Sequence, residues 1–179
     1  KLKTWGIADN LLLVIISLYS ETWTRIKLAG PFVTPEIKTT KGLKQGCVLA
    51  PMLFNLYMAD VGRTLEDACL APPRIGPVKI HILQYADDLV LLDQTKVGLQ
   101  RALTALDAYN QKNHLLLNIA KTKIITFGKF PHKLAASWHA GRQLISSTTS
   151  YKYLGVWFND RSTSVKHRKT ISTINTCVL

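Results

Sequence analysis

Two short apolar runs, residues 78–83 and 89–92, flank a segment that contains two adjacent aspartates, Asp87 and Asp88. Both runs are rich in leucine or β-branched residues, and the five residues between them suit a hairpin connection. The pattern predicts an antiparallel β-hairpin with both carboxylates at or beside its turn. Like charges placed side by side repel each other, and they lose hydration if their surroundings are dry. The acidic turn therefore needs an explanation.

Two interpretations of this turn are open from the dipeptide alone. Aspartate is a common turn residue, so an ordinary hairpin can have an acidic turn without further meaning. The alternative is a metal site, because Mg²⁺ prefers oxygen ligands and is usually held by one or two carboxylates plus substrate phosphates. A pair of such ions about 4 Å apart can activate a hydroxyl and stabilise the leaving oxygen in phosphoryl transfer.

Helices and strands alternate in mixed order along the rest of the chain, which predicts an α+β fold. An apolar stripe that begins at Pro51 and continues to about Cys69 predicts one helix, and a second stripe predicts a helix with Thr95 as its cap. A further helix over residues 11–19 has Asp9 or Asn10 as its candidate cap. The remaining segments predicted as strands are residues 22–28, 32–40, 115–118, 122–127, 143–146 and 151–158.

Positive charge is concentrated in the second part of the chain. The chain has 23 Lys and Arg against 11 Asp and Glu, a net charge of +12. Residues 108–179 hold 11 of the basic side chains and one acid, Asp160. This asymmetry favours a polyanionic partner such as nucleic acid, and the alternative is a merely solvated surface. The basic positions are Lys112, Lys121, Lys123, Lys129, Lys133, Arg142, Lys152, Arg161, Lys166, Arg168 and Lys169.

Cysteine content and hydropathy bear on the cellular compartment of the chain and on membrane insertion. Its three cysteines, Cys47, Cys69 and Cys177, are an odd number without CxxC spacing, which favours a reducing compartment. The longest apolar run, residues 11–18, is far shorter than a membrane span. We therefore expect no membrane partner.

Four motifs resemble those of reverse transcriptases, in the family's order and at its approximate spacing. Residues 85–92, YADDLVLL, resemble the active-site hairpin, and residues 41–57, KGLKQGCVLAPMLFNLY, resemble the glycine-containing loop and its following helix. Residues 117–123, LNIAKTK, resemble the lysine-bearing segment, and residues 153–156, YLGV, the primer-gripping turn. The loop is similar to that of non-LTR (LINE-type) retrotransposon enzymes, and the chain is identified as a palm fragment of this type.

The resemblance implies a domain organisation. Residues 1–160 are expected to form a polymerase palm, an antiparallel sheet with helices packed on one face. Residues 161–179 are expected to begin the thumb or a connection. The fingers and the first catalytic strand, which carries the family's third metal-binding carboxylate, are expected to be missing, and the thumb to be incomplete.

The resemblance also implies the site. Asp87 and Asp88 are expected to be catalytic metal ligands. Lys121 is expected either to protonate the departing pyrophosphate or to contact a backbone phosphate, two roles that stay open, and Lys123 is a weaker candidate for both. The residues expected to contact nucleotide or template are Gln45, Gly46, Tyr85 and Ala86, and those expected to hold the primer are Tyr153, Leu154 and Gly155.

The implied function is RNA-templated DNA synthesis with Mg²⁺, or Mn²⁺, as cofactor. Its partners are an RNA template, a DNA primer and deoxynucleoside triphosphates, inside the cell in the nucleus or cytoplasm as a ribonucleoprotein. The 179 residues alone are expected to be inactive. One alternative is a catalytically inactive retroelement relic or a co-opted nucleic-acid-binding domain, and another is a small globular protein with accidental motifs.

Overall fold

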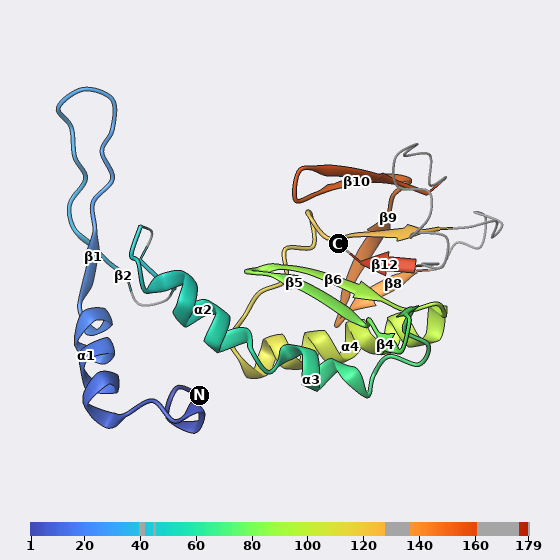
Figure 1. Ribbon diagram of the computed structural model, residues 1–179. Coiled ribbons are helices and arrows are strands. Elements are labelled where there is room, and N and C mark those ends of the chain that lie inside the picture. Colours follow the sequence, from blue (N-terminus) through green and yellow to red (C-terminus); the bar gives the residue numbers. More distant parts are fainter. Residues whose placement is uncertain (40–41, 45, 128–136, 161–175, 179) are drawn as a thin grey trace. The chain divides into compact units, whose positions relative to one another are not determined.

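The computed structural model describes residues 1–39, 42–44, 46–127, 137–160 and 176–178. They form two compact units, Lys1–Ala59 and Asp60–Leu179 (Figure 1). The first unit contains a 3₁₀ helix η1 (Lys3–Trp5), α1 (Asp9–Ser20), β1 (Thr22–Thr24), β2 (Ile37–Thr39) and α2 (Ala50–Met58). The second contains α3 (Val61–Glu66), β3 (Arg74–Ile75), β4 (Val78–Lys79), β5 (Ile82–Tyr85), β6 (Asp88–Leu92), α4 (Lys96–Lys112), β7 (Lys123–Thr126), β8 (Trp138–Ala140), β9 (Gln143–Ser147), β10 (Ser150–Tyr153), β11 (Val156–Asn159) and β12 (Thr176–Val178).

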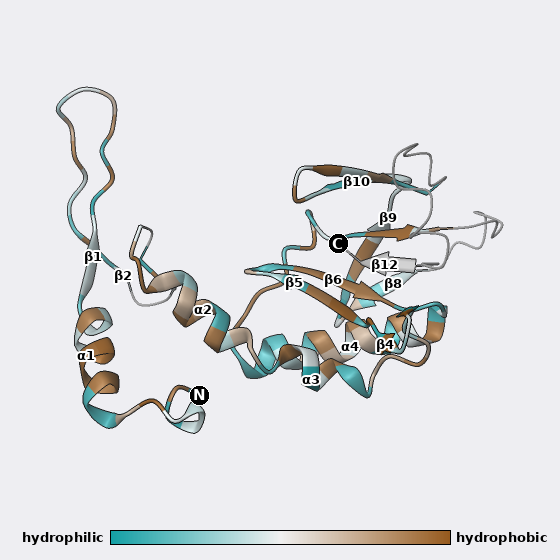
Figure 2. Cartoon of the chain, viewed as in Figure 1, coloured by the Kyte–Doolittle hydropathy of each residue, from teal (hydrophilic) through white to brown (hydrophobic). Residues whose placement is uncertain are grey.

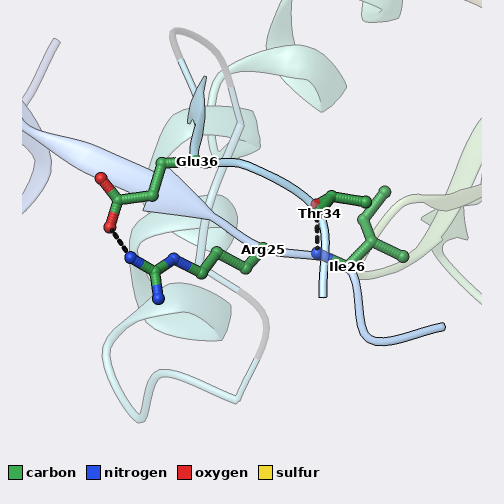
Figure 3. Close-up of polar contacts among 4 residues, drawn as sticks. All are labelled: Arg25, Ile26, Thr34 and Glu36. Atoms are coloured by element: carbon green, nitrogen blue, oxygen red, sulfur yellow. Dashed lines mark hydrogen bonds and ion pairs between the residues drawn. The ribbon is translucent and has the colours of Figure 1, made fainter. Parts of the chain in front are cut away.

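The first unit is built on α1 and a long hairpin. Strands β1 and β2 pair in antiparallel register, and a bridge between Lys27 and Val33 continues the hairpin toward its tip. The strands are shorter than predicted because Pro35 has no N–H to donate to the ladder. Between strand and tip the hairpin is held by an ion pair, Arg25 to Glu36 at 2.7 Å, and by the Ile26 N–H, which donates to the Thr34 hydroxyl at 3.0 Å (Figure 3).

The apolar side chains of this unit remain largely exposed. No residue of α1 is buried, and Figure 2 shows hydrophobic residues over much of the helix after its hydrophilic start. The hairpin likewise exposes aromatic side chains, with Phe32 at 68% and Trp23 at 51%. Among the described residues the well-packed core therefore belongs to the second unit.

The single helix predicted from Pro51 to about Cys69 is wrong, because the chain forms two helices, α2 and α3, separated at residues 59–60. Pro51 lies in the first turn of α2, as predicted. The break coincides with a contact between Asp60 and α4. The Tyr109 hydroxyl donates to Asp60 Oδ1 at 2.6 Å, and the Asp60 carbonyl accepts from the N–H of Thr64 at 3.0 Å, so that Asp60 starts a new helix against α4.

The main sheet of the second unit has the strand order β5-β6-β12-β7-β9-β8. The expected wholly antiparallel sheet is wrong in one pair, since β7 and β9 run parallel. The cause is the tight turn at Gly141, where a φ of +57° lets β8 fold back on β9. Because β8 lies at the sheet edge, β9 takes the place beside β7 and runs in the same direction. The mixture of helices and strands agrees with the predicted fold class.

Two faces of the sheet are covered by different elements. Helix α4 contacts α3, β6, β8 and β12 on one face (Figure 1). On the other, the hairpin β10–β11 packs through Tyr151, Tyr153 and Phe158 against a buried cluster that includes Val90 and Leu92. Alternate residues of β6 point to opposite faces, so neighbours in this strand serve both layers. The remaining members of the cluster are Ile125, Phe127 and the partly buried Ile80.

Three predicted strands are corrected. Residues 151–158 do not form one strand, because a turn at Leu154 and Gly155 separates β10 from the antiparallel β11. Residues 78–83 do not form one strand, because the turn at Gly76 and Pro77 pairs β4 with β3 and the next strand starts only at Ile82. Residues 115–118 form no strand. The Leu115 N–H completes the end of α4 by donating to the Asn110 carbonyl, and the side chain of Leu116 is 98% exposed.

No helix in the described part of the chain is both long and apolar enough to cross a membrane.

Candidate active site

The acidic turn closes the hairpin β5–β6. Tyr85 and Asp88 are directly opposite each other in the antiparallel register, so Ala86 and Asp87 alone form the turn. Ala86 has a φ of +52°, in the left-handed region that two-residue hairpin turns require and that L-residues other than Gly adopt at some cost. The prediction of an antiparallel hairpin with residues 85–88 at or beside its turn is confirmed.

Both carboxylates of this turn face solvent. Asp87 and Asp88 are exposed, and no hydrogen bond or ion pair joins their side chains to another described residue. Tyr85 is also exposed, at 65%. Hydration therefore offsets the repulsion between the two neighbouring charges, and both side chains are available to an incoming cation or substrate.

Lys121 lies at the same end of the main sheet as this turn. Strands β6 and β7 both pair antiparallel with β12, which makes them parallel to each other. Val178 of β12 is opposite Leu91 on one side and opposite Ile124 on the other. Counting back three residues from each of these partners reaches Asp88 and Lys121. Asp88 begins β6, whereas Lys121 lies in the turn two residues before β7, so the two residues lie at the same end of the sheet, on either side of β12.

The backbone of Lys121 is fixed while its ammonium group is not. Its N–H donates to the Asn118 carbonyl at 3.1 Å, and the Tyr151 hydroxyl donates to its carbonyl at 3.0 Å. Its exposed side chain has no hydrogen-bond or ion-pair partner among the described residues. Lys123 differs, because its Nζ donates to the Ser146 hydroxyl at 2.7 Å. Lys121 is therefore the better placed of the two lysines to reach a phosphate.

The third predicted segment, residues 153–155, forms the turn of the hairpin β10–β11. Leu154 and Gly155 both have positive φ, +46° and +85°, which makes a tight two-residue turn. Leu154 is half exposed, whereas Tyr153 packs against the buried cluster under the hairpin. The bond from Tyr151 to Lys121 attaches this hairpin to the lysine segment. The structure thus connects the lysine-bearing segment directly to the hairpin that carries the primer-gripping turn.

The glycine loop lies in the first unit. Gly46 is exposed with a φ of +77°, and Gln45 lies outside the described residues. Next to Gly46, the Tyr19 hydroxyl donates to Cys47 Sγ at 3.6 Å. This bond, followed by the N–H of Leu49, lowers the pKa of the Cys47 thiol by stabilising its thiolate. That the loop shares a site with Asp87 stays a prediction.

The donor groups at the acidic turn suit a divalent cation. The two exposed carboxylates of Asp87 and Asp88 fit the one or two that Mg²⁺ usually takes from a protein when phosphates supply further oxygens. Within the described ranges no cluster of three or more His, Cys, Asp or Glu side chains could hold a metal by itself. The acidic turn therefore fits a cation that is completed by substrate.

Asp93, directly after β6, was missed by the sequence analysis. It is fully buried, and its Oδ2 accepts from the N–H groups of Leu70 and Ala71 at 2.8 and 3.0 Å. Its Oδ1 accepts from both the N–H and the hydroxyl of Thr95 at 2.7 Å. Asp93 thereby ties the end of the acidic hairpin to the start of α4, where Thr95 is the predicted cap. The sequence signal that could have identified Asp93 is its position two residues before Thr95, the predicted helix cap.

Of the eleven basic residues predicted to make a nucleic-acid face, the structure describes five. Four are exposed and Lys123 is partly exposed, and none pairs with an acidic side chain of the described segments. The four exposed residues are Lys112, Lys121, Arg142 and Lys152. The other six, Lys129, Lys133, Arg161, Lys166, Arg168 and Lys169, lie outside the described residues.

Comparison with known proteins identifies the family. A family model described as reverse transcriptase (RNA-dependent DNA polymerase) matches residues 8–158, and the chain therefore belongs to the reverse transcriptase family.

The relatives come from non-LTR retrotransposons. The chain is 27% identical over 165 residues to the Retrovirus-related Pol polyprotein from type-1 retrotransposable element R2 of Popillia japonica, covering 88% of this chain and 27% of that protein. It is 33% identical over 158 residues to the protein of the same name from Nasonia vitripennis, covering 81% of this chain and 15% of that protein. It is 29% identical over 132 residues to the RNA-directed DNA polymerase from mobile element jockey of Drosophila funebris, covering 70% and 14%. The chain thus spans little more than a quarter of these relatives, or less.

Proposed function

We propose that this chain supplies the palm of an enzyme that copies RNA into DNA for a non-LTR retrotransposon. The observation that carries the proposal is the sheet topology, in which the start of β6 at Asp88 and the turn with Lys121 before β7 lie at the same end of the second unit. Family membership, shown over residues 8–158, supplies the reaction class. Residues 1–160 are proposed as part of the palm, and residues 161–179 as the start of the thumb or a connection.

The proposed roles follow from exposure and charge. Asp87 and Asp88 would hold a divalent cation, Mg²⁺ or Mn²⁺. When bound, the cations of a two-metal site lower the pKa of the primer hydroxyl and stabilise the leaving oxygen. Lys121 presents its ammonium to the phosphates, where it either contacts them or gives a proton to the departing pyrophosphate.

The neighbouring turns would place the substrates. Tyr85 and Ala86 border the cation site, and Gln45 and Gly46 are proposed to lie under the nucleotide and template, where a glycine lets backbone approach closely. Residues 153–155 are proposed to hold the primer end. The proposed partners are an RNA template, a DNA primer and deoxynucleoside triphosphates, bound inside the cell in a ribonucleoprotein.

A second candidate function is nucleic-acid binding without catalysis, as in a retroelement relic or a co-opted domain. It is favoured by the donor set, because no third carboxylate joins Asp87 and Asp88 among the residues that the structure describes. The four exposed basic residues without an acidic partner are compatible with both functions.

Primer extension on a primed RNA template tests the proposal. The matching segment of the jockey polymerase is replaced by that of this chain, and the parent polymerase is the positive control. We expect Mg²⁺-dependent extension that Asp87→Asn abolishes, because the substitution removes a charge but keeps the side-chain shape. Asp67→Asn, a change at an exposed carboxylate after α3, is the matched control and should retain activity.

The outcomes separate the two candidate functions. A chimaera that binds the primed template as the parent does but extends no primer would contradict catalysis and favour the binding function. A chimaera that neither binds nor extends would contradict both. The 179 residues alone are expected to bind without extending, and extension by them alone would show that the chain carries a complete site.

A further inference from the structure

We infer that Tyr151 is a positioning residue, which sets the place of the Lys121 ammonium through one hydrogen bond and couples it to the turn at residues 154–155. The inference rests on the proposed function and adds a residue to it. The inference is based on a hydrogen bond that the Tyr151 hydroxyl donates to the Lys121 carbonyl at 3.0 Å, although the two residues are 30 positions apart in the sequence.

Lys121 is held from both sides of its backbone. Asn118 shapes the turn before it, since its carbonyl accepts from the N–H groups of Lys121 and Thr122 at 3.1 and 2.9 Å. The Thr122 hydroxyl donates to the same carbonyl at 2.8 Å. On the other side, the Lys121 carbonyl accepts from Tyr151. The peptide plane between Lys121 and Thr122 is thus held at its N–H by Asn118 and at its carbonyl by Tyr151. This limits the directions that the exposed Lys121 side chain can take and lowers the entropy cost of placing its ammonium on a phosphate.

Tyr151 itself is fixed by packing. It lies in β10 opposite Phe158 of β11, and both rings pack against the buried cluster that contains Val90 and Leu92 of the acidic hairpin. One aromatic ring thus contacts the layer that carries Asp88, while its hydroxyl holds the segment that carries Lys121. The turn at residues 154–155 directly follows this strand and begins three residues after Tyr151. A shift of this hairpin on binding a primer end would therefore be transmitted to Lys121.

The test measures the reactivity of each lysine in the 179-residue chain. Acetic anhydride labels the lysines, and mass spectrometry gives the labelling rate of each one, with and without an RNA template annealed to a DNA primer plus Mg²⁺ and the next deoxynucleoside triphosphate. We expect the ligand to slow the labelling of Lys121. Tyr151→Phe removes only the hydroxyl and should reduce this protection about five-fold, the equivalent of one hydrogen bond.

A matched control separates positioning from loss of stability. Tyr109→Phe also removes one phenolic hydrogen bond, the one to Asp60 at 2.6 Å, at a site outside the proposed chemistry. Tyr109→Phe should leave the ligand protection of Lys121 unchanged. Tyr151→Phe, in turn, should leave the labelling of Lys123 unchanged, because the Nζ of Lys123 is held by Ser146. A residue that merely supports the fold would not change the protection of one lysine selectively.

The labelling results distinguish a failure of the positioning role of Tyr151 from a failure of the proposed place of Lys121. Protection of Lys121 that persists in Tyr151→Phe, or that falls equally in Tyr109→Phe, would overturn the positioning role while leaving the proposed function intact. Absence of any ligand protection of Lys121 in the unchanged chain would instead contradict the proposed place of Lys121 at the phosphates, and the inference would fall with it.

Discussion

Tyr85 and Asp88 lie directly opposite each other across the β5–β6 hairpin, so that only Ala86 and Asp87 remain to form its turn. Asp87 therefore lies in the turn itself, and Asp88 belongs to the last paired position of the hairpin. Because Asp88 begins β6, its position is determined by the sheet ladder, whereas Asp87 depends on the turn. The two neighbouring acids therefore differ in how firmly they are held, and Asp88→Asn need not have the same effect as Asp87→Asn.

The first prediction concerns two glycines in helices. Gly→Ala in a helix usually stabilises by about 1 kcal/mol. At Gly98, however, an added Cβ would collide with the buried carboxylate of Asp93, whose four hydrogen bonds prevent it from moving away. Gly98→Ala should therefore lower the free energy of unfolding by about 1–3 kcal/mol, the usual cost of overpacking. Chemical denaturation measures the change.

The matched control is Gly62→Ala in α3. An added Cβ there would meet Ile82 Cγ2 at 3.6 Å, an ordinary van der Waals contact. We expect this variant to be as stable as the unchanged chain or up to about 1 kcal/mol more stable. Equal effects of the two substitutions would contradict the described packing of Asp93 against α4.

The second prediction concerns nucleic-acid binding. Reversing three exposed charges of the basic part, Lys112, Arg142 and Lys152 to Glu, should weaken binding to a primed RNA template and make it less salt-dependent. Each lost phosphate contact lowers the log–log salt slope by about 1, because fewer counterions are released. Fluorescence anisotropy at several salt concentrations measures the slope.

The control reverses three exposed lysines of the first part of the chain, Lys27, Lys79 and Lys96, and changes the net charge by the same amount. It should have a clearly smaller effect on affinity and slope. If both triple variants bind alike, then the basic residues act only through net charge and form no binding face.

The third prediction uses the two thiols with shifted pKa values. Burial, with the nearby Asp93 charge as a second cause, raises the pKa of Cys69 to about 11, while the Tyr19 hydroxyl lowers the pKa of Cys47. The iodoacetamide alkylation rate should therefore reach its half-maximum at a lower pH for Cys47 than for Cys69. Tyr19→Phe should move the Cys47 midpoint to higher pH. Coinciding midpoints for the two thiols would contradict the local structure at both.

Cys69 also carries a prediction for stability. Because its pKa is higher in the folded than in the unfolded chain, its contribution to the free energy of unfolding is complete below the unfolded pKa, near 8.5. That contribution is lost as the pH rises toward 11. Cys69→Ala should therefore flatten the pH dependence of stability between these limits, measured by denaturation in the same buffers.

Local patterns predicted those parts of the fold that depend on neighbours in sequence. The acidic hairpin and the Thr95 cap follow from apolar runs and turn residues. The break between α2 and α3 could not be predicted, because it depends on the contact of Asp60 with Tyr109, 49 residues away. Strands β8 and β12 were missed for a similar reason. A three-residue strand has almost no periodicity of its own, and its identity comes from its partners across the sheet.

For the site, sequence supplied the residue types and the structure supplied their relation. Motif resemblance selected Asp88 and Lys121, but only the pairing of β6 and β7 with β12 shows that they lie at the same end of the sheet. The role of Tyr151 had no sequence signal, because its bond is made to a backbone carbonyl and leaves no pattern in the side chains of its partner.

The proposed function requires that Asp87 and Asp88 hold a divalent cation at the end of the sheet near Lys121 and the turn at residues 154–155. Its most direct test replaces Mg²⁺ by Fe²⁺ in the 179-residue chain with a primed RNA template bound. Fe²⁺ with ascorbate and peroxide generates hydroxyl radicals that cut the backbone close to the metal. The account predicts cuts at three separate segments, around residues 85–88, 121 and 154–155, that excess Mg²⁺ and Asp87→Asn both suppress. Cuts that persist in Asp87→Asn, or that avoid residues 85–88, would contradict it.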